Sequence, residues 1–231
     1  MSSSDIDIKC EILSQDQSQF DLSFKLIIVG DSGVGKSCLI IKAIKNHFEE
    51  LYAPTVGFEF LPFNMKIEDQ IIKLQIWDTC GQEVYRSLIN SFYRSSSLAI
   101  LVYSIDNQMS FKHLEEWLND LKEQTAPDIK IFLIGNKVDL EDKRQIPKEM
   151  GEKFCAEHNL SLFLETSAKT GFNAQNLFMK AGILLYQDHI KNKNRMSRPG
   201  SVVDIPSFIP PITDKNIEEA EEVPKRNKCP C

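Results

Sequence analysis

Hydrophobic positions along most of the chain alternate between short apolar runs and helical spacings. Apolar runs occupy 24–30, 98–104, 129–135 and 161–165, a pattern typical of buried parallel strands. Between two of these runs, Phe111, Leu114, Leu118 and Leu121 recur on one face of a helix predicted over 108–124. Strands that alternate with helices predict an α/β domain with a mainly parallel sheet and helices on both faces.

Two further strands are predicted at 58–67 and 71–77, joined by a turn at 68–70. Pro62 lies inside the first of them and lacks a backbone N–H. We therefore expect this strand at the edge of the sheet, where a missing donor is tolerated. The complete expectation is a six-stranded, mainly parallel sheet with one antiparallel edge strand.

The two ends of the chain lack this periodicity. Residues 1–23 are polar and are expected to form a flexible N-terminal extension. The folded domain is expected over 24–190. Residues 191–231 contain five of the ten prolines and an acidic cluster, which predicts a flexible C-terminal tail.

Composition and charge narrow the class of protein. Apolar residues make up 42% and charged residues 26% of the chain, the mix of a soluble globular protein. No apolar run approaches the roughly 20 residues that cross a bilayer, and the six cysteines show no paired spacing in the body of the chain, so a reducing cytosolic environment is expected. The net charge of −6 argues against nucleic acid as a partner, because phosphate contacts need basic surfaces.

The first motif with clear chemistry follows the first predicted strand. Residues 30–37 read GDSGVGKS and match G-x-x-x-x-G-K-[ST] between a strand and a helix. In such a loop the backbone N–H groups bind phosphates, the lysine meets the β- and γ-phosphates, and the serine hydroxyl suits Mg²⁺. The alternative is an ordinary glycine-rich turn, and the loop alone does not identify the nucleotide. The residues assigned here are Ser32, Gly33, Val34, Gly35, Lys36 and Ser37.

Asp78 ends the third strand within the segment WDTCGQE, at 77–83. A carboxylate at the carboxyl end of such a strand is placed to hold Mg²⁺ through water. The alternative is an aspartate that caps a helix.

Two segments at later strand ends predict a site for the base. Asn136, Lys137 and Asp139 follow the fifth strand, and Ser167, Ala168 and Lys169 follow the sixth. The Asp139 carboxylate can accept hydrogen bonds from guanine N1–H and N2–H₂, whereas adenine would leave a buried charge unpaired. Sites built on such pairing reject the analogue by about 10⁴–10⁵. The predicted ligand is a guanine nucleotide.

Together, GDSGVGKS, WDTCGQE, NKVD and ETSAK resemble the motifs of the Ras superfamily of small GTPases, over about residues 24–190. Within that superfamily, the segments KLQIWDTCGQE, YRSLINSFYRSS and LVYSID are most similar to the Rab family, as is the Cys-Pro-Cys ending. The resemblance implies the P-loop small-GTPase fold and a switch that cycles between GTP and GDP in vesicle trafficking.

The resemblance also implies roles for individual residues. Thr55, 25 positions after Gly30, is similar to a switch threonine that contacts Mg²⁺ and the γ-phosphate. Gln82 matches the catalytic glutamine that orients the attacking water. Phe48 lies where the family places an aromatic ring against guanine. Cys38 and Gly81 complete the implied nucleotide-binding residues.

A hydrophobic triad of Phe60, Trp77 and Phe92 is similar to the effector-binding surface of Rab proteins, and its alternative is simple core packing. Cys80 stands where the family has alanine, and Val84 where it has arginine. These departures bear on the set of effectors and not on the nucleotide.

Cys229 and Cys231 form the last feature, two thiols at the end of the predicted tail. Two prenyl chains anchor a protein stably where one is marginal. The alternatives are unmodified thiols or half of a metal site. The implied location is the cytoplasmic face of endomembranes, with a soluble cytosolic pool. Implied partners are effectors, a GTPase-activating protein, an exchange factor and a prenyl-binding escort protein.

Three functions stay open at this point. The first is a switching GTPase, with slow intrinsic hydrolysis by in-line water attack. The second is a membrane-anchored module that binds GTP with negligible hydrolysis. The third is an ATP-dependent kinase built on the same phosphate loop, which requires adenine binding.

Overall fold

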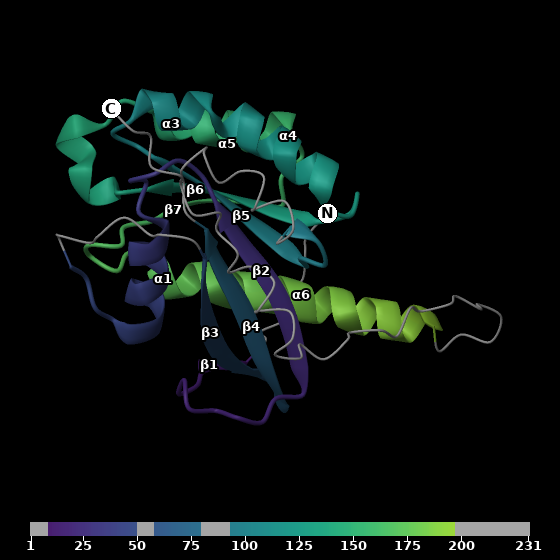
Figure 1. Ribbon diagram of the computed structural model, residues 1–231. Helices are drawn as coiled ribbons and strands as arrows, with labels where there is room; N and C mark the ends of the chain where they lie inside the picture. Colours follow the sequence, from purple (N-terminus) through teal and green to yellow (C-terminus); the bar gives the residue numbers. More distant parts are fainter. Residues whose placement is uncertain (1–8, 50–57, 80–92, 197–231) are drawn as a thin grey trace, which may run out of the picture. The chain divides into compact units, whose positions relative to one another are not determined.

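The computed structural model describes residues 9–49, 58–79 and 93–196 (Figure 1). These residues form a seven-stranded sheet in the order β1-β3-β4-β2-β5-β6-β7. The strands are β1 (Cys10–Ile12), β2 (Leu22–Val29), β3 (Phe58–Ile67), β4 (Gln70–Thr79), β5 (Leu98–Ser104), β6 (Lys130–Asn136) and β7 (Leu162–Glu165). The helices are α1 (Lys36–Lys45), α3 (Gln108–Lys112), α4 (Leu114–Gln124), α5 (Lys148–Glu157) and α6 (Ala174–Met196), with a 3₁₀ segment at Val138–Lys143.

The sheet is mixed but mostly parallel. Strand β2 pairs in parallel with β4 and β5, and β6 extends the parallel order to β7. Strand β3 runs antiparallel to both β4 and β1. The predicted α/β fold is confirmed. The predicted number of strands is wrong, because β1 adds a seventh strand and a second antiparallel one.

Alternate residues of β2 point to opposite faces of the sheet and build two separate cores. Leu26 and Ile28 belong to a cluster that includes buried residues of α1 and α6. Ile27 and Val29 belong to a second cluster, with buried residues of α4 and α5. Figure 1 shows the same division, with α3, α4 and α5 on one face of the sheet and α1 and α6 on the other. Both faces are covered, as a parallel sheet requires.

The N-terminal segment departs from the prediction of a flexible extension over 1–23. Cys10–Ile12 pair with Met65–Ile67 of β3, and the Leu13 amide donates to the Asn64 carbonyl at 2.9 Å. The Asn64 side-chain amide donates in turn to the carbonyl of Ser14 at 3.1 Å. A three-residue strand is too short to show alternation in the sequence, which is why the pattern did not reveal it.

Pro62 lies in β3 opposite Gln75 of β4. Strand β1 covers Met65–Ile67 and, within the described residues, stops short of Pro62. The prediction that this strand lies at the edge of the sheet is therefore wrong for the strand as a whole, because β1 lies outside it, but Pro62 itself lies in the part of β3 that β1 leaves unpaired.

Two helices differ from the pattern. The helix predicted over 108–124 is divided into α3 and α4 at His113, which ends the first helix and begins the second. Helix α6 continues to Met196, beyond the domain end expected near Ile190. No helix in the described part of the chain combines the length and the apolar character needed to cross a membrane.

Candidate functional site

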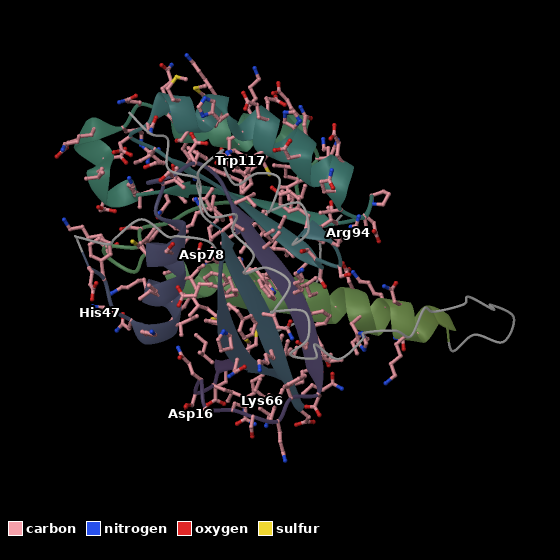
Figure 2. All side chains as sticks on the ribbon, in the orientation of Figure 1. Asp16, His47, Lys66, Asp78, Arg94 and Trp117 are labelled. Atoms are coloured by element: carbon pink, nitrogen blue, oxygen red, sulfur yellow. The ribbon has the colours of Figure 1, made fainter. Side chains whose placement is uncertain are left out.

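The predicted site residues gather where four parallel strands end. The phosphate loop follows β2, Asp78 lies near the end of β4, Asn136 ends β6, and Ser167 comes shortly after β7. Because these strands are parallel to one another, their carboxyl ends meet at one edge of the sheet. Figure 2 shows Asp78 beside α1, the helix that follows the phosphate loop.

Two glycines let the phosphate loop pass close to its neighbours. Gly30 has φ 138°, and a Cβ there would lie 2.1 Å from the backbone oxygen of Val102 in β5. Gly35 has φ 93°, and a Cβ there would lie 2.6 Å from the side-chain nitrogen of Asn136. Neither position accepts a side chain, so the loop conformation depends on both glycines.

Lys36 folds back over this loop. Its Nζ donates to the carbonyl oxygens of Gly30 at 2.7 Å and Asp31 at 2.8 Å, and the residue is buried. Gly35 precedes the first turn of α1, so the N-terminus of that helix faces the same loop. An ammonium group, loop amides and a helix N-terminus in one place form an anion site suited to phosphate.

Ser37 and Asp78 form the candidate metal site. The Ser37 hydroxyl donates to a carboxylate oxygen of Asp78, which is fully buried. Nearby, the Thr79 hydroxyl donates to the Ile28 carbonyl at 2.7 Å and fixes the end of β4 against β2.

Burial raises the pKa of Asp78 to about 6, although the Ser37 hydrogen bond and the Lys36 charge lower it. The other carboxylate oxygen, Oδ1, is buried without a hydrogen-bond partner among the described groups. A buried carboxylate with one unpaired oxygen, next to a hydroxyl, offers the hard oxygen ligands that Mg²⁺ prefers. The donor set therefore fits a magnesium ion.

Asn136 connects three loops of the site. Its Nδ2 donates to the Val34 carbonyl at 2.8 Å, and its Oδ1 accepts from the Thr166 hydroxyl at 3.0 Å. The amide thus holds the phosphate loop to the loop after β7. Thr166 was not singled out from the sequence, because its role depends on a contact between strands that are distant along the chain.

Asp139 and Ser167 lie together at the predicted base site. The Ser167 hydroxyl donates to the Asp139 carboxylate at 2.5 Å and accepts from the Thr170 amide at 3.0 Å. Lys137, with φ 69°, adopts a left-handed conformation immediately before the 3₁₀ segment that carries Asp139. Of the neighbouring residues, Ala168 is buried and Lys169 is exposed.

Arg144 braces this region and was also missed by sequence reasoning. Its guanidinium donates to Glu165 at the end of β7 at 2.7 Å and to Glu141 in the 3₁₀ segment at 2.8 Å. It therefore ties the two segments that carry Asp139 and Ser167. An arginine three positions after a glutamate was the only local signal for this brace.

The remaining predicted residues are less central in the structure. Phe48 is partly buried against the core of the α1 face, and Cys38 is partly buried in α1. Phe60 packs against Trp77 in a tilted arrangement with ring centroids 5.7 Å apart, yet 43% of Phe60 is exposed. Core packing, the alternative for this pair, is therefore wrong for Phe60.

Several predicted residues lie outside the described residues, and their roles stay predictions. They are Thr55, Cys80, Gly81, Gln82, Val84, Phe92, Cys229 and Cys231.

Comparison with known protein families identifies a family that the chain matches. The family model described as the Ras family matches residues 25–186. This range is more than half of the chain, and it contains the phosphate loop, Asp78 and both segments of the base site.

Proposed function

The chain belongs to the Ras family of small GTPases, and from this premise we propose that it acts as a Rab-like switch in vesicle trafficking. As a family member, it binds guanine nucleotide, hydrolyses GTP and cycles between its GTP and GDP forms. Family membership supports a GTPase over the ATP-dependent kinase, and the rate of GTP hydrolysis distinguishes the switch from a module with negligible hydrolysis.

One observation carries the assignment of residues to this activity. Lys36, the Ser37–Asp78 pair and the Ser167–Asp139 pair lie at one edge of the sheet, where Asn136 joins the phosphate loop to the loop after β7. In that order they are suited to the phosphates, to the metal and to the guanine base. A single nucleotide can engage all three.

The chain's own residues would contribute to hydrolysis mainly through position and charge. Lys36 and the loop amides stabilise charge on the β- and γ-phosphates, while Gln82 orients the attacking water. Ser37, Asp78 and Thr55 would hold Mg²⁺. When bound, that ion neutralises charge on the phosphate oxygens. Asp139 fixes the base, and so places the phosphates at the other end of the nucleotide.

Intrinsic hydrolysis is proposed to be slow, because the described chain supplies no arginine to the phosphates. Arg94 lies near the opposite end of the strands: its carbonyl accepts from Lys25 Nζ at 3.0 Å, and Ser97 bonds to the Lys25 backbone. Arg86 lies outside the described residues. A GTPase-activating protein that inserts an arginine would then accelerate the reaction.

The Rab-like role rests on the sequence segments described above and on the surface of β3 and β4. Phe60 and Trp77 face each other across these strands, and the exposed Phe60 ring is available for contact with an effector. With Cys229 and Cys231 prenylated, the protein would reside on the cytoplasmic face of endomembranes. An escort protein would maintain the cytosolic pool, and an exchange factor would reload GTP.

The catalytic assignment is tested by single-turnover hydrolysis of GTP. Gln82→Leu should lower the rate by roughly tenfold or more, because water positioning is a major part of what the protein contributes. Gln75→Leu is the matched control, since the Gln75 side chain bonds to Ser23 on β2 and not to site residues. Equal rates in Gln82→Leu and in the unmodified protein would remove Gln82 from the mechanism.

A further inference from the structure

The phosphate loop contains a carboxylate that the nucleotide-binding assignment does not use. Asp31 is the second residue of the loop, and both of its carboxylate oxygens are engaged by the junction of α3 and α4. His113 Nδ1 lies 2.7 Å from Oδ2, and Trp117 Nε1 donates to Oδ1 at 2.8 Å. These two partners are 82 and 86 residues away along the chain.

Both partners stand on a firmly packed element. Trp117 is 1% exposed and belongs to the core between the sheet and α4. Leu114, Leu118 and Leu121 of the same helix are fully buried in that core. His113 occupies the boundary between α3 and α4, and its carbonyl accepts from the Trp117 amide at 3.1 Å. Trp117 is therefore fixed by the core, whereas His113, whose side chain is 37% exposed, is placed by the junction of the two helices.

A carboxylate in a phosphate-binding loop is unfavourable unless it is directed away from the anion. The Trp117 N–H, together with the His113 ring when Nδ1 carries the proton, orients the Asp31 side chain toward α4. The backbone oxygen of the same residue accepts from Lys36 Nζ at 2.8 Å. Asp31 thus links a buried helix to the ammonium group that meets the phosphates.

We propose that His113 and Trp117 are positioning residues for nucleotide binding, which hold the Asp31 carboxylate against α4 and thereby fix the phosphate loop and Lys36. Without them the carboxylate is free to turn toward the phosphates, the loop loosens, and GDP dissociates faster. This inference rests on the proposed assignment of residues 30–37 as the phosphate site.

The first measurement is the release of tritiated GDP from the full chain in Mg²⁺, a label that is independent of tryptophan fluorescence. Trp117→Phe keeps the ring and removes the N–H donor. Release should accelerate about tenfold, the change expected for the loss of one hydrogen bond to a charged group. In an Asp31→Ala background, the same substitution should have no further effect, because its acceptor is absent.

His113→Ala should also accelerate release, and its matched control is His158→Ala. His158 pairs with Glu115 of the same helix α4 at 3.0 Å, but it does not contact the loop. The control should therefore release GDP at the rate of the unmodified chain. His113→Ala also tests the proposal if Trp117→Phe fails to fold.

The Lys36→Ala variant distinguishes a failure of this inference from a failure of the proposed phosphate site on which it rests. If Lys36→Ala retains GDP as the unmodified chain does, the loop is not the phosphate site and the proposed function fails. If Lys36→Ala loses GDP while Trp117→Phe and His113→Ala release it at the unmodified rate, only the positioning role is wrong. Equal acceleration by Trp117→Phe with and without Asp31 would also overturn that role, because it would show a packing effect.

Discussion

Asp78 is the residue at which the requirements of folding and of function conflict most clearly. Its carboxylate is fully buried, and burial raises its pKa to about 6, far above the 3.8 of an exposed aspartate. The folded, metal-free protein therefore binds a proton more tightly at this group than the unfolded chain does. At neutral pH the ionised carboxylate destabilises the fold and is kept for the metal that it would hold.

The pH dependence of Asp78→Asn follows from this shift. Below about pH 4 the Asp78 carboxyl is neutral, and its contribution to the stability of the fold is fully present. This contribution is lost as the pH rises through about 6, because the buried group then ionises in the folded protein. The asparagine variant stays neutral, so in EDTA it should exceed the unmodified protein by roughly 2–3 kcal/mol at pH 7.5 and by little at pH 4. Urea unfolding at the two pH values measures the difference.

Asp69→Asn is the control for Asp78→Asn, since Asp69 lies at the exposed turn between β3 and β4. At pH 7.5 this control should be about as stable as the unmodified protein, because an exposed substitution changes stability little. An Asp78→Asn variant that is less stable than the unmodified protein at pH 7.5 would contradict the account of the buried charge.

At the scale of single residues, the sequence allowed a site residue to be predicted where it carries a characteristic chemical group within a recognisable motif. Lys36 bonds to the phosphate loop and Ser37 bonds to Asp78, while their roles toward a nucleotide and a metal stay predictions. Arg144 and Trp117 were not predicted, because each acts through a partner far along the chain. No local spacing contains that information.

At the scale of elements, β1 differs most from the prediction, because it makes part of the N-terminal segment a strand of the sheet. It covers the end of β3, and Asn64 holds the chain that follows it. An uncovered edge strand offers unpaired backbone groups to other chains, so this short strand also protects the sheet.

Asn64→Ala tests the attachment of β1. The Asn64 side chain is 2% exposed and donates to the carbonyls of Ser14 and Gln15. Its loss should lower the free energy of unfolding by about 1–2 kcal/mol and speed amide exchange over Cys10–Leu13. Strands β5 and β6 should keep their protection. The control is Gln75→Ala, which removes an amide from β4 and should leave exchange in β1 unchanged. If Asn64→Ala does not speed exchange over Cys10–Leu13, Asn64 does not hold β1.

Strands that are continuous apolar runs were predicted well, whereas the polar three-residue strand β1 and the division of a helix were not. Strand β5 coincides with the apolar run at 98–104, and β6 lies within one residue of its prediction. Strand β1 has three residues, too few for a period, and the division at His113 leaves the helical spacing intact. The extension of α6 to Met196 lies in polar sequence without an apolar stripe.

At the scale of the whole molecule, the proposed membrane anchor depends on the last three residues. Replacing both Cys229 and Cys231 by serine should move the protein from the membrane fraction to the cytosol, because two prenyl chains supply most of the binding energy. Cys155→Ser is the matched control, since Cys155 lies in α5. Fractionation of cells that express each variant measures the effect, and an unmodified protein found only in the cytosol would contradict lipid anchoring.

The central claim is that the chain switches between GTP and GDP forms, and we propose that in the GTP form the terminal phosphate orders the chain around Thr55 and around Gln82. Amide hydrogen exchange of the protein loaded with GDP and with a non-hydrolysable GTP analogue tests it most directly. The account predicts slower exchange in the peptides that contain Thr55 and Gln82 in the triphosphate form, with β5 and β6 unchanged. Identical exchange of these two segments in both forms would contradict it.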